Sequence, residues 1–246
     1  MVPFGSNPCH REGVGSHPIE LVAIDPSGIA LFDDEVVGTA LLEALGAVEG
    51  TSDSSLVDGA SYVAHTRGIS IRTVLRSLLG DDERADYATR AFELAFPSVL
   101  AQGGVDVVPG AVETFATLRQ AGRRVCLVSR LPQSCIDAVV DELGWHHLVD
   151  LTVAPTSSTR TPPHPDLVLS AIVRLGVASV RDVAVVADSA NTLVAGTRAG
   201  ASAVIGVIGG RHACVELERV PHTHVVRSMD EVPCLLDVIS TRVHAA

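Results

Sequence analysis

The sequence predicts an α/β protein with a parallel sheet flanked by helices and a helical cap inserted after the first strand. Short apolar runs alternate with amphipathic segments along most of the chain, which is typical of parallel sheets with right-handed crossovers. The first run, Leu21 to Ile24, contains no charge, as expected of a strand covered on both faces. Between about residues 47 and 106 the apolar spacing is helical, with no clear strand.

The remaining elements are read from the same periodicities. Strands are expected at 124–129, 149–153, 183–188, 203–207 and 224–226. Helices are expected at 33–45, 111–121, 132–143, 165–175, 189–199 and 229–239. In the cap, two apolar stripes at 71–79 and 88–96 are separated by a break at 80–82.

The chain therefore divides into three parts. Residues 1–18 are rich in Gly, Pro, Ser and His, which predicts a poorly ordered tail. Residues 19–46 and 107–246 form the predicted core. Residues 47–106 form the predicted cap.

Composition excludes several classes of protein. The 246 residues are 47% hydrophobic, enough for a sizeable core, and the formal charge of −11 argues against a nucleic-acid partner. No apolar run approaches the roughly 20 residues of a membrane span, and the chain does not start like a secretory signal. Five scattered cysteines without a Cys-x-x-Cys pair favour reduced thiols in the cytoplasm. The sequence leaves open whether the chain forms a homodimer.

All 18 basic side chains are arginines, since the sequence contains no lysine. No lysine Schiff base can therefore form, and no lysine can hold a phosphate.

Three predicted strands end in polar residues: Asp25, Ser129 and Asp188. Because parallel strands present their carboxyl ends at one edge, where open α/β sheets bind ligands, we expect these side chains to meet. Two carboxylates and a hydroxyl suit phosphoryl transfer, with one carboxylate attacking phosphorus, the hydroxyl holding a phosphoryl oxygen and the other carboxylate completing a Mg²⁺ site. The alternative stays open that these residues only cap helices or end buried strands.

Four motifs resemble those of the haloacid dehalogenase superfamily, in the family's order and spacing. The segment Ile24 to Ile29 is similar to D-x-D-G-T, whose first Asp is the nucleophile. Leu127 to Ser129 resembles the second motif, a strand that ends in Ser or Thr. Residues 163–166 resemble K-P-x-P-D, and residues 186–196 resemble G-D-x-x-x-D-x-x-A-G. The resemblance runs from about residue 19 to the C-terminus and is nearest to the phosphonatase-like and phosphoglycolate phosphatase-like groups.

The resemblance implies a Rossmannoid core, Mg²⁺ as cofactor and a set of site residues. It implies an aspartyl-phosphate at Asp25 and a metal held by Asp25, Asp188 and the main-chain carbonyl of Ser27. The phosphate-binding residues would be Ser27, Gly28, Ser129 and Arg130. For Arg130 the alternative is an exposed surface pair.

Four departures from the family pattern bear on activity. Ser27 stands where the family has its acid–base Asp, and serine cannot do general acid–base work near neutral pH. Pro162 stands where the third motif has Lys or Arg. Arg160, two residues earlier, could bind the phosphate instead, because guanidinium binds phosphate in a bidentate way. The alternative is that Arg160 is an exposed loop arginine. Thr192 replaces the second acid of the fourth motif, and Ile29 replaces the Thr of the first. Phosphonatase chemistry proper needs a cap lysine, which this chain lacks.

We therefore expect a Mg²⁺-dependent hydrolase of a small phosphorylated metabolite, with Asp25, Ser129 and Arg160 as catalytic residues. The first alternative is a catalytically impaired member that binds a phosphorylated ligand or a protein partner. A metal-free dehalogenase is a weaker alternative, because Asp188 would then lack its usual purpose. His65, in the predicted cap, is a candidate base or an exposed helix end.

Overall fold

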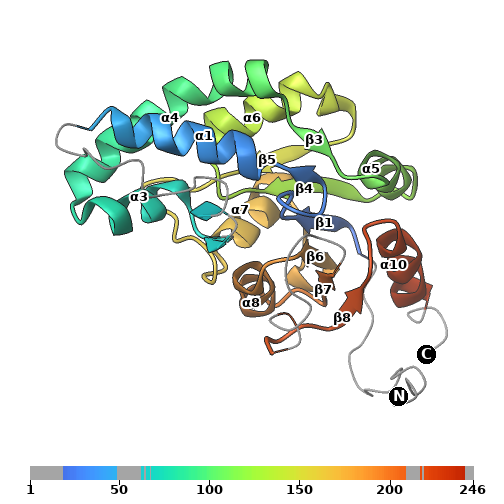
Figure 1. The fold of residues 1–246 in the computed structure, drawn as a ribbon. Coiled ribbons are helices and arrows are strands. Elements are labelled where there is room, and N and C mark those ends of the chain that lie inside the picture. The colour runs from blue at the N-terminus through green and yellow to red at the C-terminus, as the bar shows by residue number, and fades with distance from the viewer. Residues whose placement is uncertain are drawn as a thin grey trace, which may run out of the picture.

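The computed structural model describes residues 19–48, 62, 63, 65, 66, 68–208, 217 and 219–241. Its centre is a six-stranded parallel sheet with the order β5-β4-β1-β6-β7-β8 (Figure 1). The strands are β1 Leu21–Ile24, β4 Arg124–Val128, β5 Leu151–Val153, β6 Val183–Ala187, β7 Ala203–Val207 and β8 His224–Val226. The sheet confirms the predicted α/β class.

The central strand is buried on both faces, as its uncharged sequence requires. Its residues alternate, so that Val22 and Ile24 enter one core cluster while Leu21 and Ala23 enter another. β1 pairs with β4 on one side and with β6 on the other. The ends of these three strands are therefore neighbours.

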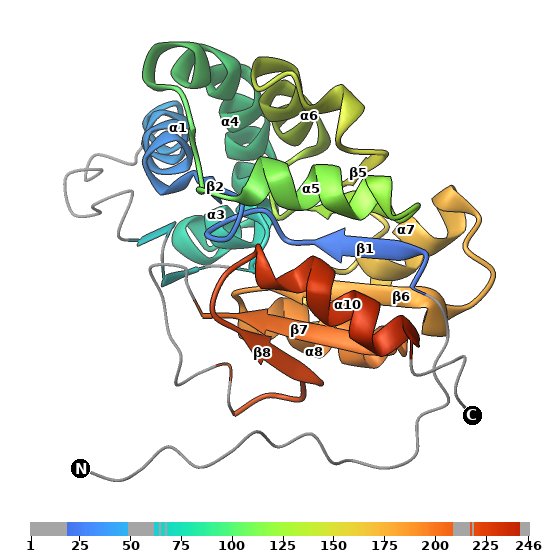
Figure 2. The ribbon, with the colours of Figure 1, turned by 90° about the vertical axis from the view of Figure 1, so that its right-hand side faces the viewer.

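Helices cover the two faces of the sheet. One face packs against α5 Ala111–Gln120, α6 Gln133–Glu142 and α10 Glu231–Thr241. The other packs against α7 Asp166–Leu175 and α8 Ala190–Ala199. Figure 2 shows α5 and α10 in front of the sheet and α8 behind it. Two short 3₁₀ turns, η2 Trp145–His147 and η3 Val180–Asp182, complete the connections.

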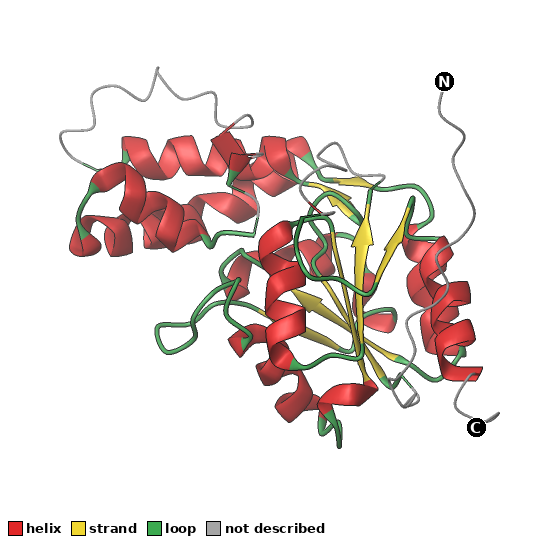
Figure 3. Cartoon of the chain, turned by 90° about the horizontal axis from the view of Figure 1, so that it is seen from below, coloured by secondary structure: helices red, strands yellow, loops and turns green. Residues whose placement is uncertain are grey.

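Three further helices lie together beyond the sheet (Figure 3). They are α1 Asp34–Gly46, α3 Ile71–Leu79 and α4 Asp82–Gly103. Both α1 and α3 pack on α4, and α4 also packs on α6 of the core. The same buried cluster runs through these helices and the core face that α5, α6 and α10 cover.

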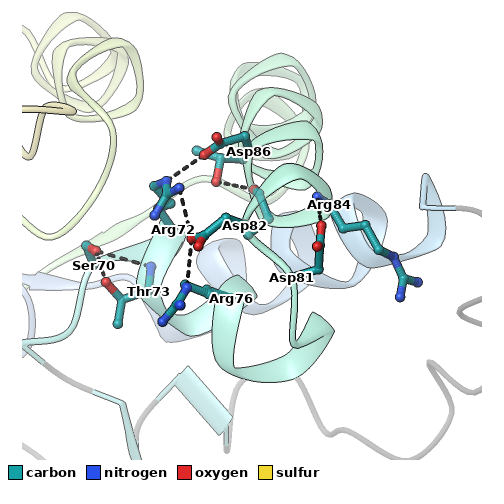
Figure 4. Close-up of polar contacts among 10 residues, drawn as sticks. Ser70, Arg72, Thr73, Arg76, Asp81, Asp82, Arg84 and Asp86 are labelled. Atoms are coloured by element: carbon teal, nitrogen blue, oxygen red, sulfur yellow. Dashed lines mark hydrogen bonds and ion pairs between the residues drawn. The ribbon is translucent and has the colours of Figure 1, made fainter.

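The turn between α3 and α4 is where the sequence predicted a break. Gly80, with a φ of 70°, ends α3, and the Asp81 carboxylate begins α4 by accepting the Arg84 N–H at 2.8 Å. Arg72 of α3 reaches across the turn to Asp86 of α4 (Figure 4).

The domain division stays a prediction. The proposed boundary at residue 46 leaves α1 with the core, whereas α1 packs on α4. A boundary close to Asp33 would describe this packing better. Residues 1–18 and 49–61, which carry the predicted tail and the first part of the predicted cap, lie outside the described residues.

Two short strands that the sequence did not predict tie the helices to the core. β2, Leu31–Phe32, pairs antiparallel with β3, Asp106–Val107. The Val108 N–H also donates to the Ala30 carbonyl at 2.9 Å. The chain thus enters and leaves the helical block at one point, directly after the loop that follows β1. Within the described residues, no helix is long and apolar enough to cross a membrane.

Candidate active site

Asp25, Ser129 and Asp188 follow three adjacent strands, β1, β4 and β6. Their exposed fractions are 5%, 2% and 6%. The Asp25 N–H donates to the Val186 carbonyl at 3.0 Å, and the Ser129 N–H donates to the Val153 carbonyl at 2.9 Å. Backbone hydrogen bonds of the sheet therefore fix two of the three residues at the same buried edge.

The Asp25 carboxylate lies beside two hydroxyls at the start of α8. Thr192 Oγ1 donates to Asp25 Oδ2 at 2.8 Å, and Ser189 Oγ lies 3.4 Å from the same oxygen. Thr192 occupies the position of the family's second acid. From the sequence this replacement is only the loss of an acid, whereas the structure gives Thr192 a direct contact with the proposed nucleophile.

The loop after Asp25 folds back on itself. Gly28 has a φ of 83°, and its N–H donates to the Leu31 carbonyl at 2.7 Å. The Leu31 N–H donates to the Pro26 carbonyl at 2.9 Å. The Gly28 N–H, a predicted phosphate ligand, is thus engaged inside the loop in this conformation.

The Ser27 hydroxyl is also engaged. It donates to Asp33 Oδ2 at 2.7 Å, and the two residues are 4% and 2% exposed. Asp33 precedes α1, but its side chain makes no capping hydrogen bond there. The carboxylate is therefore directed to the site and not to the helix.

Arg130 is a buried cation beside these groups. Its side chain is 3% exposed, which rules out the surface alternative. Its Nη2 lies 4.0 Å from Asp33 Oδ2, and its Nη1 donates to the Val63 carbonyl at 3.5 Å. Within the described part of the chain, Nε and Nη2 make no hydrogen bond. The guanidinium can therefore bind a further group of acceptor oxygens.

Ser129 has its hydroxyl in the turn that leads to Arg130. Its Oγ accepts the Leu131 N–H at 3.1 Å. This bond uses a lone pair of the hydroxyl and leaves the proton available for donation.

Arg160 is placed differently. Its guanidinium binds both carboxylate oxygens of Asp166, at 2.9 and 3.1 Å, and its side chain is 66% exposed. These hydrogen bonds raise the pKa of Arg160 and lower that of Asp166. His65 is exposed as well. Neither residue is among the buried groups at the strand ends.

A turn of the helical block covers the Asp25 side of the site. Gly68 has a φ of 72°, and a Cβ there would lie 2.9 Å from Ser189 Oγ and 3.0 Å from Asn191 Cβ. The Ile71 N–H donates to the Arg130 carbonyl at 3.3 Å. The block that was predicted as a cap thus contacts the carboxyl edge of the sheet at two points.

Sequence reasoning missed three members of this site. From the sequence, Asp33 and Ser189 are only the first residues of two expected helices, and Thr192 is only the loss of an acid. The one sequence feature that could have indicated Asp33 is its carboxylate, which directly follows the apolar pair Leu31 and Phe32. Nothing in the sequence pairs Ser27 with Asp33 or Thr192 with Asp25, because these contacts depend on the turn and on strand order.

The two buried cysteines of the described residues, Cys126 and Cys135, offer no competing nucleophile. Burial raises the pKa of Cys126 and of Cys135 to about 12. Both thiols therefore stay protonated near neutral pH and are poor nucleophiles.

The donor set fits Mg²⁺. This ion takes hard oxygen ligands and is usually bound by one or two carboxylates together with waters. Asp25 and Asp188 supply two buried carboxylates on adjacent strand ends. Among the described residues no cluster of three or more His, Cys, Asp or Glu side chains forms a denser metal site.

A separate cavity of about 320 Å³ lies between α1 and the end of α4. Its lining includes Asp34, Glu35 and Glu43, but none of the strand-end residues. The buried polar cluster and this cavity are distinct.

A parallel sheet of this order, with an acid, a hydroxyl and an acid on three adjacent strand ends, is a Rossmann-like fold with a polar site at its carboxyl edge. The sequence model of the haloacid dehalogenase-like hydrolases matches residues 8–200, and the chain belongs to that family.

Two curated relatives agree with this assignment. The chain is 30% identical over 153 residues to the probable phosphatase IndB of Dickeya dadantii, covering 62% of this chain and 66% of that protein. It is 32% identical over 113 residues to a phosphonoacetaldehyde hydrolase of Bordetella pertussis, covering 46% of this chain and 41% of that enzyme. The chain thus matches less than two thirds of the length of either relative.

Solved structures share the fold of this chain. A phosphonoacetaldehyde hydrolase-like protein from Oleispira antarctica superposes with a TM-score of 0.76 over 98% of this chain and 99% of that one, at 16% identity. CbbY from Rhodobacter sphaeroides, in complex with phosphate, superposes with a TM-score of 0.70 over 87% of this chain and 96% of that one, at 21% identity.

Proposed function

We propose that the chain is a Mg²⁺-dependent phosphohydrolase of a small phosphorylated metabolite, with Asp25 as the nucleophile. The observation that carries this proposal is the buried Arg130 guanidinium. A buried charge is costly unless it is paired and hydrogen-bonded. Nε and Nη2 of Arg130 have no acceptor among the described residues, and the nearest Asp33 oxygen is 4.0 Å away. A phosphoryl group would supply the missing acceptors.

Charge balance supports the cofactor. Asp25, Asp33 and Asp188 with Arg130 carry a formal charge of −2 among the buried groups of the site. An anionic substrate would add to it. Mg²⁺ held by Asp25, Asp188 and the Ser27 carbonyl would offset the repulsion between the carboxylate and the phosphoryl group.

In the first step, Asp25 attacks phosphorus, the bond from phosphorus to the leaving oxygen breaks, and Ser129 and Arg130 hold phosphoryl oxygens. Water then attacks the phosphorus of the aspartyl-phosphate, the bond from phosphorus to the Asp25 oxygen breaks, and inorganic phosphate leaves. Ser27 can accept the proton of that water only if it passes its own proton to Asp33, 2.7 Å away. Asp33 returns this proton through Ser27 to the next leaving group. The Ser27–Asp33 pair thereby takes the place of the family's single Asp.

The proposed acid limits which leaving groups the substrate can carry. A relay through a hydroxyl is a weaker acid than a carboxyl beside the leaving oxygen, so acyl phosphates and activated esters are favoured. The names of the relatives, which include a phosphatase and a phosphonoacetaldehyde hydrolase, agree with a small phosphorylated compound. The scattered cysteines favour a cytoplasmic location for the proposed enzyme.

The test is phosphate release from a panel of phosphorylated metabolites, including acetyl phosphate, with and without Mg²⁺. We expect Mg²⁺-dependent release that is lost in Asp25→Asn. In parallel, calorimetry should show weaker Mg²⁺ binding in Asp188→Asn. Release that persists in Asp25→Asn, or Mg²⁺ binding unchanged in Asp188→Asn, would contradict the proposal.

One observation favours the impaired, ligand-binding alternative. Arg160, the residue nearest to the missing third-motif cation, is bound by Asp166 and is exposed. Under this alternative, inorganic phosphate would raise the melting temperature of the protein while no member of the panel is hydrolysed.

A further inference from the structure

Two hydroxyls and the proposed nucleophile form a buried chain of hydrogen bonds. Ser189 Oγ donates to Thr192 Oγ1 at 2.8 Å, and Thr192 Oγ1 donates to Asp25 Oδ2 at 2.8 Å. The exposed fractions are 6% for Ser189, 2% for Thr192 and 5% for Asp25. Thr192 has one proton to donate, and this geometry directs it to the carboxylate.

Backbone contacts fix both ends of this series of hydrogen bonds. Ser189 is the N-cap of α8, and its Oγ accepts the Thr192 N–H at 3.3 Å. Asp25 is joined to β6, the strand that leads into α8, by its N–H bond to Val186. Donor and acceptor are therefore both anchored to β6 or its extension, so the bond does not depend on a flexible loop.

We propose that Thr192 is the positioning residue of Asp25, supported by Ser189. This inference rests on the proposed function, in which an Asp25 oxygen attacks phosphorus. A hydrogen bond to Oδ2 restricts rotation of the carboxylate and so fixes the direction of attack by the other oxygen, Oδ1. Thr192 transfers no proton in this step. It only donates a hydrogen bond while the bond from Asp25 to phosphorus forms and the bond to the leaving group breaks.

A neutral hydroxyl suits this role in the present chain. The family motif has an acid at position 192, and a carboxylate there would face Asp25 Oδ2 at hydrogen-bond distance. Without a cation between them, two carboxylates so close cannot both be ionised without a large cost. With Thr192 the contact is attractive, and the buried surroundings strengthen it.

The test compares Thr192→Val with Thr192→Ser. Valine keeps the shape and removes the hydroxyl, whereas serine keeps the hydroxyl. With acetyl phosphate and Mg²⁺, rapid-quench measurement of phosphoryl transfer to Asp25 should slow about 10- to 100-fold in Thr192→Val. We expect KM to change little, because Ser129 and Arg130 still bind the phosphoryl group. Thr192→Ser should restore most of the rate.

Crystal structures of the two variants give a readout that does not depend on catalysis. The Asp25 carboxylate should rotate in Thr192→Val and keep its orientation in Thr192→Ser. An unrotated carboxylate in Thr192→Val would overturn the inference, as would an unchanged rate of phosphoryl transfer. If the unmodified protein transfers no phosphoryl group, the proposed function fails, and the two crystal structures still decide whether Thr192 positions Asp25.

Discussion

The Ser27 hydroxyl donates a 2.7 Å hydrogen bond to the buried carboxylate of Asp33. The residue at the family's acid–base position is therefore paired with an acid from the end of the same loop. Sequence alone predicts that Ser27→Asp would raise turnover by one or more orders of magnitude, because it restores the missing acid. The structure changes this expectation.

Ser27→Asp would place a second carboxylate next to Asp33 in a buried site. Two carboxylates at this distance cannot both ionise, so the new acid would not act as a free base. We expect little gain from the single substitution. The double variant Ser27→Asp with Asp33→Asn removes the conflict and should raise steady-state hydrolysis of a phosphate ester by about 10²-fold or more over the unmodified protein. Equal gains in the single and double variants would contradict the role given to Asp33.

Arg130 and Arg160 should behave as opposites. Arg130→Gln should raise KM for acetyl phosphate strongly, because the buried guanidinium is the proposed anion-binding group. Arg160→Gln should leave KM and kcat almost unchanged, because Arg160 is 66% exposed and bound to Asp166. Steady-state kinetics of the two variants tests which arginine binds the substrate. A large loss in Arg160→Gln would show that this residue leaves Asp166 to reach the substrate.

Gly68 should tolerate no side chain. In Gly68→Ala the new Cβ would meet Ser189 Oγ at 2.9 Å, so we expect slower phosphoryl transfer to Asp25. Gly80→Ala is the matched control, because Gly80 has a similar φ of 70° but no atom within 4 Å of its would-be Cβ. Both variants carry the backbone strain of a positive φ, and only the first should lose activity beyond its loss of stability. Equal rates in the two variants would count against contact between the Gly68 turn and the site.

The Arg72–Asp86 pair predicts a small pH dependence of stability. A hydrogen bond from Arg72 lowers the pKa of Asp86. A carboxyl with a lowered folded-state pKa contributes stability above its ordinary pKa and loses it as the pH falls through the lowered value. Both side chains are exposed, at 44% and 46%, so solvent screens the effect. Urea unfolding at pH 7 and at pH 3 should show a slightly smaller acid-induced loss in Arg72→Met than in the unmodified chain. An identical loss would mean that the pair contributes nothing.

Much of the fold follows from periodicity. The strands at 21–24, 183–187 and 203–207 are uncharged apolar runs, which are typical of buried strands in a parallel sheet. Their observed bounds agree with the predicted ones to within one residue. β2 and β3 have two residues each, too few to show an alternation. The three strand-end residues are also predictable, because parallel strands end at one edge.

The partners of those residues are not predictable in the same way. Thr192 reaches Asp25 from 167 positions away because β1 and β6 are neighbours and α8 starts at the end of β6. Arg160 was expected at the phosphate from its distance along the chain to the third motif. It binds Asp166 because that acid starts α7 six residues later and the loop between them brings the two together.

In the proposed mechanism Asp25 carries the phosphoryl group during turnover. Acid-quenched protein from a reaction with acetyl phosphate and Mg²⁺, digested and mapped by mass spectrometry, tests it directly. We predict a phosphoryl adduct on the peptide that contains Asp25, accumulating in a burst because the Ser27–Asp33 relay makes the second step slow, and absent in Asp25→Asn. Hydrolysis of acetyl phosphate without an adduct at Asp25, or an adduct that survives Asp25→Asn, would contradict the account.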